Sequence, residues 1–195
     1  MELHTNIITF HARSRNEWRD WLAEHHQSEQ SVWLIIYHKS SETASVYYEE
    51  AVEEALCFGW IDSVAHKRDE GSKYQFFSPR KAKSNWSRAN KERAERMIAA
   101  GLMTAEGQKR IDFAKESGTW DALVDVQNSI VPDDLQELLN KNKVALVHFQ
   151  AFPPSSKRII LEWILNAKKP VTRQKRIEET VRLAAENIKA NHYRQ

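Results

Sequence analysis

The sequence of 195 residues has few of the residues that define several classes of protein. Its one cysteine, Cys57, excludes a disulfide framework within the chain and a cysteine-based zinc finger. Glycine and proline number only five each, so the chain is neither collagen-like nor of low complexity. The longest uninterrupted apolar run, Val32–Tyr37, has the length of a strand and is too short for a membrane-spanning helix. These absences indicate an ordinary globular protein without membrane insertion.

The amino-acid composition does not indicate a particular function. The net charge is +2 and hydrophobic residues make up 41% of the chain, so neither nucleic acid nor membrane is favoured by overall charge. Residues 1–10 contain no basic run followed by a long apolar one, the pattern of a secretory signal. A lone thiol without such a signal is typical of a reducing compartment, and we expect a cytoplasmic location.

Strand patterns are confined to about the first 80 residues. Short β-branched or alternating runs predict strands at 7–10, 31–39, 61–67 and 73–78, and helical spacing predicts helices at 15–25 and 49–58. Beyond residue 78 only helical patterns occur. We therefore expect an α+β fold, with an N-terminal antiparallel sheet and packed helices in residues 1–86 and an all-helical C-terminal region in residues 87–195, together forming one compact unit.

Charge is concentrated in separate segments. Residues 79–96 hold seven Lys or Arg against two Glu, and residues 155–176 hold seven against one. Acidic segments elsewhere, such as residues 42–62, could pair with them inside the fold. Alternatively, the basic segments form a cationic groove.

The first motif is ALCFGWIDS, residues 55–63, in which a helix ends at Gly59 and a strand begins. Cys57 lies near the helix C-terminus and near acidic residues, which disfavours a reactive thiolate and favours a role in core packing. Asp62 and Ser63 form a polar pair at the start of the strand. Such a pair either lines a cleft or caps the turn.

The second motif is FFSPRKAKSNWS, residues 76–87, which leads from a strand into a helix. Helix N-termini bind anions through free N–H groups. Arg80, Lys81 and Lys83 add positive charge, Ser84 follows them, and the ring of Trp86 could stack on a planar ligand. This is the best anion-binding candidate in the chain. Alternatively, the serines cap the helix, Trp86 packs and the lysines face water.

The chain contains no template for familiar catalysis. The nucleophile elbow, the two glycine-rich phosphate-binding motifs and the H-E-x-x-H zinc motif are all absent. The adjacent histidines His25 and His26 would point about 100° apart on a helix. We therefore predict no catalytic residue, metal site or cofactor.

The last segment, PPSSKRIILEWILNAKKPVTRQKRIEETV, predicts a hairpin of two helices with a basic outer face and apolar stripes suited to packing. Together with ALCFGWIDS, FSPRKAKSNWS and NKERAERMIAAGLMTAEG, it resembles the bacterial YdeI/OmpD-associated family over nearly the whole chain. Ser78 and Ala82 stand where the family commonly has Thr and Pro. The resemblance implies an α+β region followed by helices and a link to bacteriocin protection, but no reaction.

The leading hypothesis is a bacterial stress or bacteriocin-protection protein that acts by binding a small anionic ligand or a partner protein. The alternatives are an enzyme with Asp62 as its acid–base group, and non-specific nucleic-acid binding through the basic segments. The sequence predicts neither the ligand nor the oligomeric state. The candidate ligand-binding residues are Trp60, Asp62, Ser63, Arg80, Lys83, Ser84 and Trp86.

Overall fold

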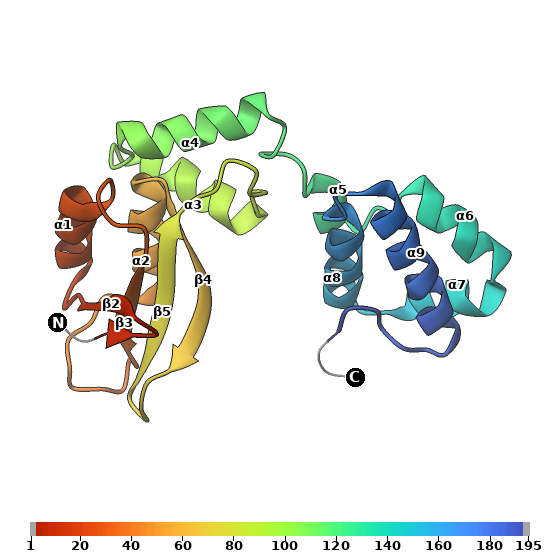
Figure 1. The fold of residues 1–195 in the computed structure, drawn as a ribbon, viewed down its shortest axis with the longest axis horizontal. Helices are drawn as coiled ribbons and strands as arrows, with labels where there is room; N and C mark the ends of the chain where they lie inside the picture. Colours follow the sequence, from red (N-terminus) through yellow and green to blue (C-terminus); the bar gives the residue numbers. More distant parts are fainter. Residues whose placement is uncertain (1–2, 193–195) are drawn as a thin grey trace. The chain divides into compact units, whose positions relative to one another are not determined.

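The computed structural model describes residues 3–192, which fall into two compact units, residues 1–121 and 122–195 (Figure 1). The expected boundary after residue 86 marks the end of the sheet. The N-terminal unit nevertheless extends to residue 121, because α3 (Arg88–Ala99) and α4 (Ala105–Glu116) pack on α2 (Tyr48–Cys57). Within residues 3–192, no helix is both long and apolar enough to cross a membrane.

The first unit is built on a sheet in the order β1-β2-β3-β5-β4. Its strands are β1 (Leu3–His4), β2 (Ile7–His11), β3 (Val32–Tyr37), β4 (Trp60–Lys67) and β5 (Ser72–Pro79). The α+β fold class is confirmed, but the sheet is mixed rather than antiparallel, since β2 and β3 run parallel. Helix α1 (Arg15–His25) lies in the connection between them and returns the chain to the same end of the sheet, as a parallel pair requires.

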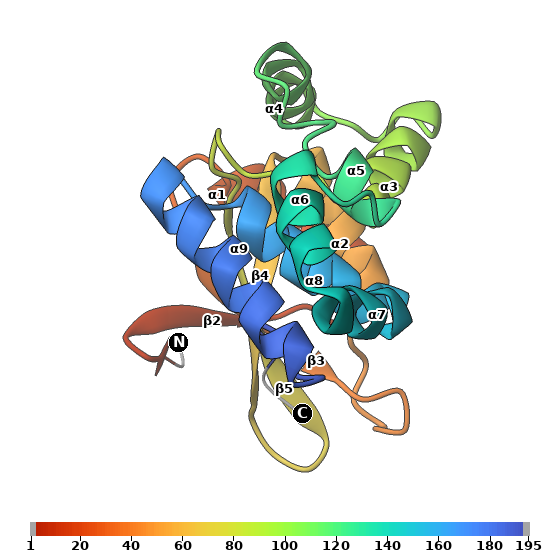
Figure 2. The ribbon, with the colours of Figure 1, turned by 90° about the vertical axis from the view of Figure 1, so that its right-hand side faces the viewer.

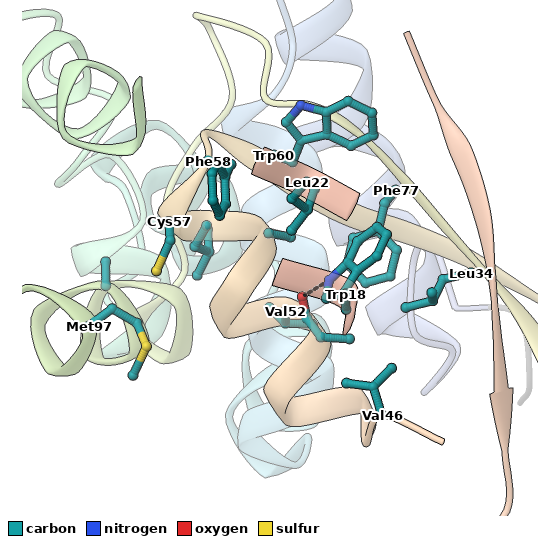
Figure 3. Close-up of a cluster of buried hydrophobic side chains, with 14 of the residues drawn as sticks. Trp18, Leu22, Leu34, Val46, Val52, Cys57, Phe58, Trp60, Phe77 and Met97 are labelled. Atoms are coloured by element: carbon teal, nitrogen blue, oxygen red, sulfur yellow. Dashed lines mark hydrogen bonds between the residues drawn. The ribbon is translucent and has the colours of Figure 1, made fainter. Parts of the chain in front are cut away.

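One face of the sheet packs on helices. Val32, Leu34 and Ile36 of β3 join a core that includes residues of α1 and α2. In this core the indole Nε1 of Trp18 donates a hydrogen bond to the Ala51 carbonyl at 3.0 Å (Figure 3). The helix α1 begins as its sequence predicts, because the Ser14 side chain accepts a hydrogen bond from the Glu17 N–H.

The opposite face of the sheet has its own small apolar cluster, which contains Trp33, Ile35 and Tyr74. Five of the six residues of β3 are buried, so this strand is covered on both faces, as its unbroken apolar run predicted.

The second unit is helical. Its helices are α5 (Val124–Gln127), α6 (Asp133–Lys141), α7 (Lys143–Ala151), α8 (Pro154–Leu165) and α9 (Pro170–Ala185). Helix α9 packs against α6, α7 and α8 (Figures 1 and 2). The sequence patterns did not predict α7. The sequence pattern predicts Thr172 as the cap of the last helix, but this helix begins at Pro170, because proline suits the first helical turn.

The apolar spacing of α8 predicts a core face made of Ile159, Ile160, Trp163, Ile164 and Ala167. The observed buried face is rotated from this one. Ile160, Leu161 and Ile164 are buried, whereas Ile159 is 40% exposed. Trp163 is half-buried at the edge of this core, where the Arg176 guanidinium lies 5.0 Å from its ring centre. The expectation that Ile159 and Trp163 lie at the centre of the core is therefore wrong.

Candidate functional site

The candidate site is the loop of residues 80–86, which joins β5 to α3. Its first residue is anchored to the sheet, because the Arg80 N–H donates a hydrogen bond to the Gly59 carbonyl at 2.9 Å. A turn follows, in which the Ser84 N–H donates to the Lys81 carbonyl at 3.0 Å. The helix then begins with the Ser87 side chain accepting from the Asn90 N–H, in agreement with the alternative in which a serine caps this helix.

The side chain of Arg80 is buried and incompletely paired. Only 4% of the residue is exposed, and its guanidinium carbon lies 3.9 Å from the centre of the Trp86 ring. The Nη2 atom donates to the Asn85 carbonyl, but Nε and Nη1 have no hydrogen-bond partner within the described chain. Buried polar groups are nearly always hydrogen-bonded, and an ionised group without partners is costly. Arg80 is therefore unusual for a buried polar side chain.

Arg80 carries its charge at neutral pH in spite of this burial. Removal from water lowers the pKa of Arg80 to about 10, and the negative charge of Asp62 opposes the shift. Asp62 does not neutralise the guanidinium directly, since it accepts a hydrogen bond from the Tyr48 hydroxyl at 2.7 Å. Burial and this contact with Asp62 raise the pKa of Tyr48, so Tyr48 remains a hydrogen-bond donor.

Aromatic residues hold the far end of the loop. Trp86 is buried, its backbone N–H donates to the Thr119 carbonyl at 3.2 Å, and its ring centre lies 4.9 Å from that of Trp120. The ammonium groups of Lys91 and Lys115 each lie 5.3 Å from the Trp120 ring centre. The sequence analysis missed Trp120, because nothing in its local pattern relates it to a loop more than 30 residues earlier.

The other predicted site residues lie in different surroundings. Trp60 is a buried core residue (Figure 3). Its Nε1 donates a hydrogen bond to the His26 carbonyl at 3.1 Å. Ser63 is exposed on β4, and Lys83 is exposed at the tip of the loop, with Ser84 half-buried beside it. Of the predicted residues, Arg80 contacts Trp86 and interacts electrostatically with Asp62. Trp60 has a packing role instead.

The interpretation of Cys57 as a core residue is confirmed. Its side chain is fully buried, and burial, together with the charge of Glu54, raises the pKa of the thiol to about 11. A thiol with such a pKa is almost entirely protonated at neutral pH and is a poor nucleophile.

Several charges of the first basic segment are paired within the fold. Arg93 contacts Glu49 at 2.6 Å and Arg96 contacts Glu53 at 2.9 Å, both on α2. Internal pairing therefore accounts for these two cations. Arg80 differs from them, because its partner groups are an aromatic ring and a carbonyl.

Comparison with known proteins gives two matches along the chain. Residues 10–110 match the family described as "Domain of unknown function (DUF8412)", and the chain belongs to this family. Residues 128–187 match the family described as "Bacteriocin-protection, YdeI or OmpD-Associated", which confirms the resemblance in the C-terminal unit. No curated protein and no solved structure matches the chain. The site around Arg80 thus lies in the part of the chain whose family has no described function.

Proposed function

We propose that this protein is a bacteriocin-protection or stress protein that works by binding a small anion at Arg80. The observation that carries the proposal is the buried Arg80 guanidinium with two unpartnered nitrogen atoms. An oxyanion accepts charge-assisted hydrogen bonds from such nitrogens, and these are stronger than bonds between neutral groups. The anion would satisfy donors that the chain itself leaves unpaired.

The loop around Arg80 supports an anionic ligand in two further ways. Lys81 and Lys83 are exposed on the same loop and add positive charge close to Arg80 in the sequence. Trp86 supports one face of the guanidinium, which fixes its orientation before a ligand arrives.

The same geometry gives less support to the enzyme alternative. An acid–base role for Asp62 requires a carboxylate that can exchange its proton with a substrate. Asp62 instead accepts a hydrogen bond from Tyr48 and stabilises the charge of Arg80. We therefore assign Asp62 a positioning role beside the anion.

The protective function itself rests on the printed name of the family that residues 128–187 match. We propose that the anion site in the first unit and the family domain in the second serve one task. A bacterial strain sensitive to a bacteriocin would survive better when it produces this protein. Arg80→Met would abolish the protection while leaving the amount of folded protein unchanged.

The binding proposal is tested by thermal unfolding in increasing phosphate or acetate at constant ionic strength. A ligand that binds only the folded state raises the melting temperature in a saturable way. We expect this rise in the native chain and, with a weaker affinity, in Lys83→Met, which removes an exposed cation from the same loop. Arg80→Met should lose it.

Sulfate and phosphate also stabilise proteins generally by exclusion from their surfaces, without saturation and without any need for Arg80. Equal shifts in all three proteins would therefore contradict the proposed site. A loss in Lys83→Met as large as that in Arg80→Met would show that the effect comes from the net charge of the loop.

A further inference from the structure

Two histidines far apart in the sequence meet on the face of the sheet opposite α1 and α2. His4 belongs to β1 and His66 to β4, and the Nε2 atom of His4 lies 2.9 Å from the Nδ1 atom of His66. Both rings are accessible to solvent, as the exposed hydrogen bond between them shows. The pair is separate from the Arg80 loop and plays no part in the proposed anion binding.

Aromatic neighbours fix the two imidazole rings. His4 stacks on Tyr74, with ring centres 4.1 Å apart and an angle of 12° between the planes. The ring centre of His66 lies 4.7 Å from that of Trp33, which His4 also contacts edge-on at 4.9 Å. The Trp33 indole in turn donates a hydrogen bond to the Thr5 hydroxyl at 3.0 Å, next to His4 in the chain. Packing thus holds the two rings side by side.

We propose that His4 and His66 bind one divalent transition-metal ion, of which Cu²⁺ and Ni²⁺ fit best. Imidazole nitrogen bonds such ions at roughly 2.0–2.1 Å. Two nitrogens 2.9 Å apart then subtend an angle of about 90° at the metal, the angle between neighbouring ligands in the tetragonal geometry that these ions prefer. Tetrahedral Zn²⁺ requires a wider separation of the two nitrogens, so it fits less well.

Metal binding replaces the hydrogen bond between the rings. In the metal-free protein one of the facing nitrogens carries the shared proton, and this proton must move to the other nitrogen of the same ring. Both rings must also turn within their planes, so that the two lone pairs converge on the ion. Within residues 3–192 no group of three or more His, Cys, Asp or Glu residues is placed to hold a metal. The two histidines would therefore be the protein ligands, and water would complete the coordination.

The Arg68 guanidinium lies 5.9 Å from the Tyr74 ring centre, and its positive charge weakens binding of a cation nearby. We accordingly expect a moderate affinity that depends on both histidines. Removal of either should lower the affinity about tenfold or more, which corresponds to about 1.4 kcal/mol.

The test is calorimetric titration of the full-length, tag-free chain with Ni²⁺ and Cu²⁺ at slightly alkaline pH, where histidine is unprotonated. The variants are His4→Ala and His66→Ala, and the matched control is His38→Ala, which removes an exposed histidine from another segment. We expect one ion per chain in the native protein and in His38→Ala, with weaker binding in the two other variants. Electron paramagnetic resonance of the Cu²⁺ complex should show two coupled imidazole nitrogens, and one in each of those variants.

Unchanged Ni²⁺ and Cu²⁺ affinity in His4→Ala and His66→Ala would overturn the proposal. So would an equal loss in His38→Ala, which would indicate non-specific binding to surface histidines. If the two variants lower only the free energy of unfolding and leave metal affinity intact, the pair is a structural hydrogen bond and not a metal site.

Discussion

The guanidinium of Arg80 stacks on the indole ring of Trp86, with 3.9 Å between its central carbon and the ring centre. Stacking of this kind is favourable, and more so away from water. It does not, however, supply hydrogen-bond acceptors for Nε and Nη1. The relationship between these two residues thus stabilises a cation in the fold while leaving part of its hydrogen-bonding capacity available to a ligand.

Arg80→Met should leave the free energy of unfolding in anion-free buffer unchanged or raise it. The substitution loses the stacking on Trp86 and one hydrogen bond, but it also removes a buried charge whose desolvation costs several kcal/mol. Urea unfolding measures the difference. A loss above about 2 kcal/mol would show that Arg80 is a fully satisfied structural residue.

Gly107→Ala should destabilise the first unit although alanine is the better helix former. A Cβ atom at residue 107 would lie under 3.0 Å from the Cys57 carbonyl oxygen, where α4 meets the end of α2. Overpacking of this kind costs about 1–3 kcal/mol. Gly71→Ala is the control, since its nearest neighbour would be 3.7 Å away. Equal stability of the two variants in urea would contradict the close approach.

Cys57 should react slowly with a thiol reagent in the folded protein and rapidly in denaturant. Full burial blocks access, and a pKa of about 11 keeps the thiolate scarce at neutral pH. Stopped-flow labelling in the two conditions provides the comparison. Rapid labelling in native buffer would reopen nucleophilic chemistry at this residue.

Ile160→Ala should cost about 2–5 kcal/mol, as truncation of a buried isoleucine does. Ile159→Ala, one residue earlier on α8, should cost less than about 1 kcal/mol because Ile159 is 40% exposed. Chemical unfolding followed by far-ultraviolet circular dichroism measures both losses. Similar losses in both variants would contradict the observed orientation of α8.

The sequence predicted most elements of the fold, because their evidence is local. The unbroken apolar run of β3 and the serine caps of α1 and α3 each act within a few residues. The parallel pairing of β2 with β3 could not be predicted in this way, since it depends on where α1 packs. The same holds for the rotation of α8, which is set by its neighbours in the helical unit.

The sequence predicted which segment forms the candidate site, but not how the side chains of this segment are arranged. The residue types from Arg80 to Trp86 indicated an anion-binding loop, and the structure places two of them in contact. The burial of Arg80 had no local signal, because a run of basic residues usually faces water. It depends on the segment from Thr119 to Trp120 that holds Trp86. The contact between His4 and His66 likewise joins residues 62 positions apart.

The central claim, that an anion binds at Arg80, is tested most directly by NMR of the arginine side chains. The Nε–H signal of Arg80, assigned by its absence in Arg80→Lys, is followed while phosphate is added at constant ionic strength. The account predicts a saturable shift of this signal, with the same dissociation constant that thermal unfolding gives. An Arg80 signal that stays fixed while phosphate stabilises the protein would contradict it.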